Sequence, residues 1–262
     1  METQNRLSAL LRAAQMPISN SFLRTLLDMI RSLIASIYDS SLSIAHTSYI
    51  TPTQKLRQLS TPLIICILGS PGAGKGTQSA LLKRAIPGFT HLSYGDLIRY
   101  EDRIPGSWVS SLPRRHNTKT PVVPADGAMQ LIRQTIDSGA KHGQLMWLVD
   151  GFPRRESHVK AWAAQMPPAQ CTLYFSCPRD LAIQRVIGRA EASGRPDDAD
   201  PRLVTERIDR SISERDALLF ALHNYGIRAV EIDAAQSVDD VKRIVHTVCQ
   251  EAIKPWKLEQ GL

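Results

Sequence analysis

A strand-like apolar run that leads directly into a glycine-rich loop constrains the fold of this chain more than any other feature. Residues 63–68 are six consecutive apolar residues with no polar face, as expected of a central strand covered on both sides. The next nine residues, 69–77, read GSPGAGKGT and lead into the helix-like stretch 78–82. This order of strand, glycine loop and helix predicts a loop that surrounds the phosphates of a nucleotide.

Each residue type in the loop has a chemical reason. Glycines let consecutive backbone N–H groups turn around a phosphate, and the following helix adds the positive end of its dipole. Lys75 can reach the outer phosphates, and the Thr77 hydroxyl can face Mg²⁺. The general pattern has this hydroxyl directly after the lysine, whereas here Gly76 lies between them. We therefore expect a nucleoside triphosphate to be bound by Gly72, Ala73, Gly74, Lys75, Gly76 and Thr77.

From residue 63 onward, strand-like and helix-like stretches alternate. We expect further strands at 89–92, 145–149, 171–176 and 228–232, and helices at 75–85, 126–138, 178–191, 201–223 and 238–252. Such alternation predicts a three-layer α/β domain with a parallel sheet. The segment 101–121 contains three prolines and few helix formers, so we expect it to be irregular.

A phosphate loop does not by itself determine the reaction. The Asn-Lys-x-Asp pattern of guanine recognition is absent from the sequence. Arginines, which stay protonated and form paired hydrogen bonds to phosphate oxygens, occur near the expected strand ends and in one helix. They are Arg99, Arg154, Arg185, Arg189, Arg195 and Arg207. Because phosphoryl transfer is catalysed mainly by positioning and charge neutralisation, this set favours a phosphotransferase.

Several motifs in series resemble the nucleoside monophosphate kinases, specifically the group of short-lid adenylate kinases and UMP/CMP kinases. Residues 72–78 match that family's phosphate loop, including the displaced threonine, and 150–154, Asp-Gly-Phe-Pro-Arg, match its most recognisable motif. Further motifs in the family's order are 91–99, 123–124, 175–178 and 185–198. The resemblance implies a three-layer P-loop kinase fold with a five-stranded parallel sheet, a small acceptor-binding subdomain and a short lid.

The resemblance also implies a domain organisation. Residues 61–262 would form the P-loop nucleoside monophosphate kinase domain, with an acceptor-binding insert at about 93–126 and a lid at about 190–201. The lid segment is short and lacks cysteines, so it is unlike the zinc-bearing long lid of some relatives. Residues 1–60 lie outside the resemblance.

The family's pattern assigns roles to residues that match its motifs. Lys75 would stabilise charge on the transferring phosphoryl group, and Arg185 and Arg189 would lie on the ATP side. Asp197 and Asp198 would hold the closed lid. The residues implied in catalysis are Lys75, Arg154, Arg195 and Arg207.

The pattern likewise implies residues for the acceptor and for a metal ion. Arg99 and Arg154 would hold the phosphate of the nucleoside monophosphate. Thr77 and Asp150 would hold Mg²⁺ or its waters, with ATP as the phosphoryl donor. The acceptor site as a whole would contain Tyr94, Arg99, Val123, Gly151, Arg154 and His158.

The departures from the family's pattern fall on the acceptor side. Tyr94 stands where the family usually has a small Thr or Ala, and His158 stands where Gln or Asn usually reads the acceptor base. The irregular segment 101–121 replaces helices of the acceptor-binding subdomain. Two interpretations remain open: either base recognition has been rebuilt, or the usual substrate is retained despite local change.

The resulting hypothesis is an ATP-dependent nucleoside monophosphate kinase acting on UMP/CMP or AMP. The alternative is a kinase-like ATP-binding protein with a different acceptor or none. We expect small nucleotides as partners, a monomer, and no nucleic acid, because the basic excess is not accompanied by a recognition motif. The four cysteines lack metal-binding spacing and are expected to be buried, unpaired thiols.

The first 60 residues differ in composition from the rest. They contain six basic and three acidic residues, which gives +3 of the formal net charge of +7, and many serines. Apolar residues at helical spacing predict an amphipathic helix at 20–38. The composition of this segment is typical of an organelle transit peptide. The alternative is an extra helix packed on the body of the protein. We expect a cytoplasmic protein, or a mitochondrial one if the segment is a transit peptide.

Overall fold

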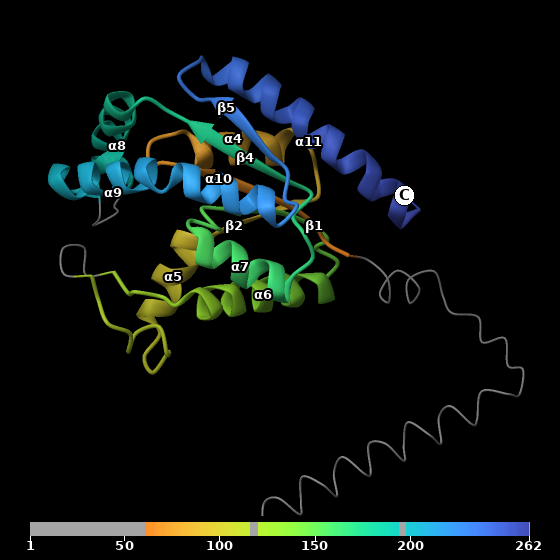
Figure 1. Cartoon of the computed structure of the whole chain (residues 1–262), viewed down its shortest axis with the longest axis horizontal. Coiled ribbons are helices and arrows are strands. Elements are labelled where there is room, and N and C mark those ends of the chain that lie inside the picture. The colour runs from red at the N-terminus through yellow and green to blue at the C-terminus, as the bar shows by residue number, and fades with distance from the viewer. Residues whose placement is uncertain (1–60, 116–119, 194–197, 262) are drawn as a thin grey trace, which may run out of the picture. The chain divides into compact units, whose positions relative to one another are not determined.

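The computed structural model describes residues 61–115, 120–193 and 198–261, which alternate between strands and helices (Figure 1). The strands are β1 (Leu63–Gly69), β2 (Phe89–Ser93), β3 (Met146–Asp150), β4 (Cys171–Ser176) and β5 (Ala229–Asp233). The helices are α4 (Lys75–Ala85), α5 (Tyr94–Arg103), α6 (Ala125–Lys141), α7 (Glu156–Gln165), α8 (Arg179–Ser193), α9 (Pro201–Ser213), α10 (Arg215–Asn224) and α11 (Val238–Gln260). The segment 1–60, with its expected helix at 20–38, lies outside the described residues.

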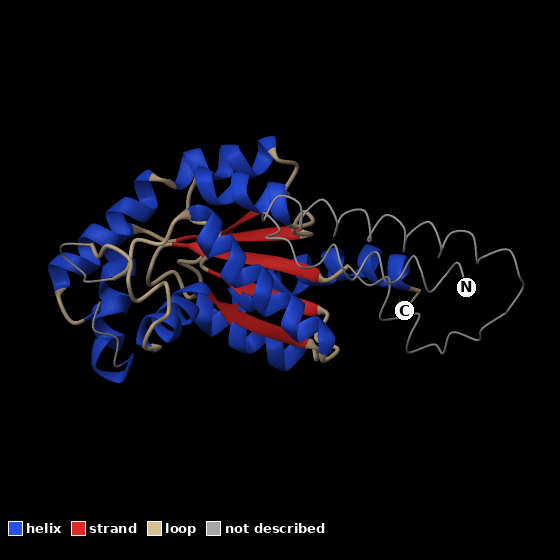
Figure 2. Cartoon of the chain, turned by 90° about the horizontal axis from the view of Figure 1, so that it is seen from below, coloured by secondary structure: helices blue, strands red, loops and turns tan. Residues whose placement is uncertain are grey.

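The five strands form one parallel sheet in the order β2-β3-β1-β4-β5. The strand that precedes the glycine loop is central, with Ile65 of β1 opposite both Leu148 of β3 and Cys171 of β4. Helices cover both faces of the sheet (Figure 2). The predicted three-layer α/β fold with a five-stranded parallel sheet is confirmed. Because the strands are parallel, the loops that follow them meet at one edge of the sheet.

Alternation along β1 explains why the strand has no polar residue. Ile64 points into a core shared with α6, α7 and α10, whereas Ile65 points into a core shared with α4 and α11. Both side chains are fully buried. A strand with a helix layer on each face needs apolar residues at every position, and this places the glycine loop at the centre of the site-bearing edge.

Two helical predictions need correction. The stretch 201–223, expected as one helix, is divided at Glu214 into α9 and α10. Ile208 of α9 packs against α8, whereas Leu222 of α10 packs into the core that contains Ile64 of β1. The two helices therefore pack against different elements. Helix α7 was not expected because it is only 10 residues long and begins directly after the motif 150–154.

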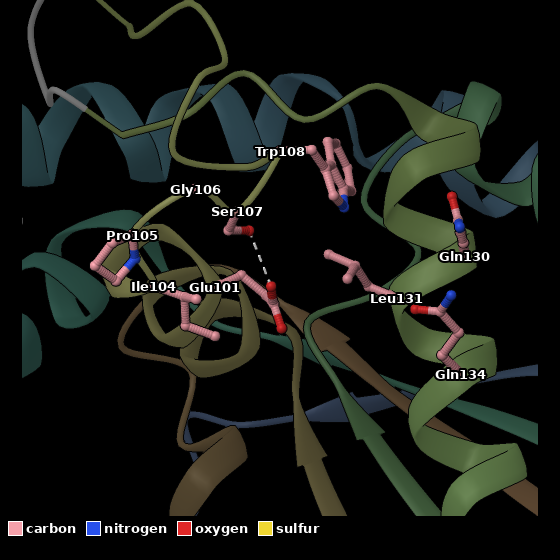
Figure 3. Close-up of a pocket in the computed structure, with 9 residues that line it drawn as sticks. All are labelled: Glu101, Ile104, Pro105, Gly106, Ser107, Trp108, Gln130, Leu131 and Gln134. Carbon is pink, nitrogen blue, oxygen red and sulfur yellow. Dashed lines mark hydrogen bonds between the residues drawn. The ribbon is translucent and has the colours of Figure 1, made fainter.

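Between α5 and α6, the described residues 104–115 and 120–124 are irregular, as predicted for the segment 101–121, whereas residues 101–103 belong to α5. Side-chain contacts hold this insert. Ser107 Oγ donates to Glu101 Oε2 at 3.1 Å. Trp108 lies so close to α6 that a Cβ on Gly127 would be 2.5 Å from its ring. An open cavity of about 550 Å³ lies between these elements and contains none of the predicted site residues (Figure 3).

All four cysteines are unpaired, as predicted. Cys66, Cys171 and Cys249 are buried, whereas Cys177 is half-buried. In the described ranges, no helix has the length and apolar character needed to span a membrane.

Candidate active site

The glycine loop is shaped by positive backbone angles and close approach. Gly72 has φ 84°, and a Cβ there would lie 2.3 Å from the carbonyl oxygen of Ala182 on α8. Gly74 has φ 83° and precedes α4. Helix α4 has no acidic residue in its first turn and no side-chain cap. Its first N–H groups and its dipole are therefore available to an anion.

Lys75 extends across the loop. Its Nζ donates to the carbonyl oxygens of Gly69 at 2.7 Å and Ser70 at 2.8 Å. The pKa of Lys75 is lowered to about 8, mainly by burial and also by the positive charges of nearby arginines, while the charge of Asp150 opposes the shift. Bound phosphates would favour the protonated form of Lys75 again.

Three arginines from three parts of the chain lie near enough to Lys75 for their positive charges to lower its pKa. Arg154 follows β3, Arg189 lies on α8, and Arg207 lies on α9. Each was predicted as a site residue, and the fold brings their charges to the glycine loop. This concentration of positive charge is suited to phosphoryl groups.

Asp198 links two of these arginines. Its side chain is fully buried, with Oδ2 at 3.2 Å from Arg189 Nε and Oδ1 at 3.0 Å from Arg207 Nη1. The predicted partners Arg195 and Asp197 lie outside the described residues. Asp198 thus orients two guanidinium groups toward the site and partly balances their charge.

Asp150 and Thr77 were predicted to hold Mg²⁺. Asp150 ends β3, and its charge reaches Lys75. Asp150 Oδ2 lies 3.3 Å from His91 Nε2 on β2, a contact that the sequence did not indicate. Thr77 is exposed in the first turn of α4. Mg²⁺ retains waters and needs few protein oxygens when phosphates also bind it, so one carboxylate and one hydroxyl fit this ion.

Arg99 and Arg154, which were both predicted to hold the acceptor phosphate, converge at the start of α5. A Cβ on Gly95 would lie 3.4 Å from Arg99 Nη2 and 3.6 Å from Arg154 Nη2, so both guanidinium groups lie beside the same backbone position. Arg154 is held by a hydrogen bond from its Nε to the Gly151 carbonyl oxygen at 2.7 Å. Arg99 forms an ion pair with Asp96. The arrangement gives two forked cations for one phosphate group.

The two unusual residues of the acceptor side belong to one aromatic cluster with Phe152. The ring of His158 stacks on Phe152 with centroids 4.6 Å apart, and Tyr94 lies 5.1 Å from Phe152. The guanidinium carbon of Arg154 lies 4.9 Å from the centroid of the Tyr94 ring. Tyr94 is 5% exposed and His158 is 3% exposed. Aromatic side chains therefore fill the part of the acceptor side where small and amide residues were usual for the family.

The tautomer of His158 follows from its hydrogen bond. The backbone N–H of Arg154 donates to His158 Nδ1 at 3.2 Å, so the proton of the neutral ring resides on Nε2. Burial, followed by the charges of Arg155 and Arg154, lowers the pKa of His158 to about 3. Nε2 is buried and has no hydrogen-bond partner in the described part of the chain. His158 is therefore a neutral ring with an unsatisfied donor.

The remaining predicted site residues differ in their contacts and burial. Arg185 Nη1 donates to the carbonyl oxygen of Ala234 at 2.9 Å and so ties α8 to the turn after β5. Val123 is buried at the end of the insert. Gly151 has φ 78° and follows β3. Ala73 is buried, and Gly76 is exposed.

Comparisons with known proteins agree with this geometry. A family model described as an AAA domain matches residues 68–203, from the end of β1 to the start of α9. The UMP-CMP kinases of Gallus gallus and Homo sapiens are 33% and 32% identical to this chain over 185 residues, which cover 69% of this chain and 93% of each relative. The uridylate kinase of Saccharomyces cerevisiae is 30% identical over 190 residues, which cover 72% of this chain and 92% of the relative.

Proposed function

Because the chain belongs to the nucleoside monophosphate kinase family and is an enzyme of that family, we propose that it transfers the γ-phosphoryl group of ATP to UMP or CMP. The names of its relatives support a pyrimidine acceptor. The observation that carries the proposal is the convergence of the charges of Arg154, Arg189 and Arg207 on Lys75 beside the glycine loop. Transfer between two phosphate groups needs this concentration of positive charge.

On the donor side, the glycine loop and the N-terminus of α4 would hold the triphosphate of ATP. Lys75 would follow the transferring phosphoryl group and neutralise the charge that spreads over its oxygens. Arg189 and Arg207, oriented by Asp198, would contact the same group. These roles need positioning and charge but no covalent intermediate.

On the acceptor side, Arg99 and Arg154 would hold the monophosphate from the start of α5. A phosphate oxygen of the acceptor would attack the γ-phosphorus while the bond to the β-γ bridging oxygen breaks. The acceptor oxygen is already ionised near neutral pH, so no general base is required. Binding both substrates between cations places the two phosphates in line and excludes water.

Mg²⁺ would be bound with ATP, held by the Thr77 hydroxyl and the Asp150 carboxylate directly or through water. When bound, it would add positive charge beside the β- and γ-phosphate oxygens. His91 contacts Asp150 and would fix the direction of that carboxylate.

The test is a coupled assay of diphosphate formation from ATP with UMP, CMP, AMP, GMP, dCMP and dUMP as separate acceptors. We expect UMP and CMP to give the highest kcat/KM. ATP hydrolysis without acceptor should be much slower than transfer, because the site excludes water. Tight ATP binding with no turnover of any acceptor would identify a kinase-like binding protein and contradict the proposal.

A further inference from the structure

The guanidinium group of Arg154, one of the two arginines proposed to hold the acceptor phosphate, lies over the ring of Tyr94. The distance from Arg154 Cζ to the centroid of the ring is 4.9 Å. A cation within about 6 Å of the centroid is attracted to the face of an aromatic ring. Tyr94 is the first residue of α5 and stands where small residues are usual for the family. A small residue at this position would have no ring to offer Arg154.

The ring of Tyr94 is fixed by the core beneath it. Tyr94 is buried in the same core cluster as Ile64 of β1. Its ring centroid lies 5.1 Å from that of Phe152 and 6.2 Å from that of His158. The ring therefore loses its rotational freedom on folding, before any ligand binds. Arg154, in contrast, is exposed, so a ligand can reach its N–H groups.

Arg154 differs from the other arginines of the site in the group that supports it. Arg99 forms an ion pair with Asp96, and the buried Asp198 holds the site arginines of α8 and α9. Among the residues that the structure describes, no carboxylate oxygen lies within 4.0 Å of a guanidinium nitrogen of Arg154. An aromatic face therefore stands where the other arginines of the site have an acid.

An aromatic face is suited to an arginine that has to bind a phosphate. A carboxylate would occupy the N–H groups and compete with the phosphate, whereas a ring attracts the cation through its face. Nε of Arg154 already donates to the Gly151 carbonyl oxygen at 2.7 Å. A Cβ on Gly95 would lie 3.6 Å from Arg154 Nη2 and 3.4 Å from Arg99 Nη2. The terminal nitrogen of the supported arginine thus lies on the side where the second arginine converges.

We propose that Tyr94 is a positioning residue of the acceptor site, whose ring holds Arg154 in the orientation that binds the acceptor phosphate. The proposal rests on the proposed function, in which Arg99 and Arg154 hold that phosphate. Because the ring already restrains the arginine when the acceptor arrives, less side-chain freedom is lost on binding. Tyr94 thus acts through Arg154 on the phosphate of the acceptor and not on its base.

Calorimetric binding of UMP to the full-length chain tests the proposal through a double-mutant cycle. Tyr94→Leu removes the ring but keeps an apolar side chain, so the affinity for UMP should fall about fivefold. Tyr94→Phe keeps the ring and should rescue most of that loss. In the Arg154→Ala background, Tyr94→Leu should have almost no effect, because the arginine that the ring holds is absent. Tyr94→Met, which also lacks a ring, serves if Tyr94→Leu does not fold.

The kinetic constants separate positioning from a general loss of structure. In Tyr94→Leu the KM for UMP should rise about fivefold, whereas kcat and the KM for ATP should change less than about twofold. The matched control is Trp162→Phe, which alters the same core at a ring 6.1 Å from that of Phe152. This variant retains both Tyr94 and Arg154, so its affinity for UMP should equal that of the wild type.

Three results would overturn the proposal: unchanged affinity for UMP in Tyr94→Leu, a loss that Tyr94→Phe does not rescue, or an equal loss with and without Arg154. The last of these would show that Tyr94 contacts the base or acts through folding. A coupled loss of UMP affinity supports the proposal even if UMP and CMP are not turned over. In that case the proposed function alone is contradicted.

Discussion

The phosphate side and the acceptor side of this site differ in the chemical groups that form them. The phosphate side consists of backbone groups of the glycine loop, Lys75, and two arginines balanced by the buried Asp198. The acceptor side consists of a buried aromatic cluster together with Arg99 and Arg154, whose guanidinium groups lie beside the same backbone position at the start of α5. The phosphate side matches the family's pattern closely, whereas the acceptor side departs from it.

This difference shows which part of the reaction tolerates change. Phosphoryl transfer needs positive charges around the transferring group whichever acceptor is used. A displaced backbone amide or lysine would therefore lower the transfer rate with every acceptor. The acceptor needs only to be held with its phosphate in line, and different side chains can achieve this. We therefore infer that the reaction is retained and that recognition of the acceptor has changed.

The largest expected effect is the loss of Lys75. Lys75→Ala removes a positive charge from the transferring phosphoryl group, so kcat/KM should fall by about 10²–10³-fold or more for every acceptor. Steady-state kinetics with ATP and UMP measure this, with thermal unfolding as the control for folding. Wild-type turnover in this variant would show that the phosphate side does not have the proposed role.

A larger effect on the KM of the acceptor than on the KM of ATP is expected for Arg154. Arg154→Ala removes charge-assisted hydrogen bonds to the acceptor phosphate, so the acceptor KM should rise about 10–100-fold. The KM for ATP should change by less than about threefold. Arg133→Ala, which removes an exposed ion pair with Asp137 on α6, is the matched control and should leave both constants unchanged. Equal losses toward ATP and the acceptor would show that the two sides are not separate at this residue.

Features of this site that depend on neighbouring residues in the sequence could be predicted, whereas features that depend on contacts between distant segments could not. The glycine loop was predicted because glycine at positions such as Gly72 is required by local backbone angles and by one close approach. The division between α9 and α10 was not, because it is determined by which core each half contacts. The His91–Asp150 contact joins separate strands, and no short motif contains it.

The acceptor side shows the same limit. Tyr94 and His158 were identified from their positions in motifs, but their contacts with the ring of Phe152 follow from the packing of three segments.

A smaller effect is expected on the free energy of unfolding, whose pH dependence should depend on the buried His158 of the acceptor side. The native pKa of His158 is about 3, below the ordinary value of 6.5, so the unfolded chain takes up a proton there before the folded chain does. This contribution to stability is fully present above about pH 6.5 and is lost as the pH falls toward 3, by about 1.4 kcal/mol per pH unit. Urea unfolding of the wild type and of His158→Phe between about pH 7 and 5 measures it. The variant should lose less stability over this range, and parallel curves would contradict the buried neutral state of His158.

The central claim is that the acceptor side can be changed without damage to phosphoryl transfer. The most direct test is the double variant Tyr94→Ala/His158→Asn, which restores the residue types usual for the family. Kinetics at saturating ATP should show kcat within a few-fold of the wild type, because the variant removes no charged side chain near Lys75, together with a changed order of kcat/KM among the acceptors. A fall in kcat comparable to that of Lys75→Ala, or an unchanged order of acceptors, would contradict the claim.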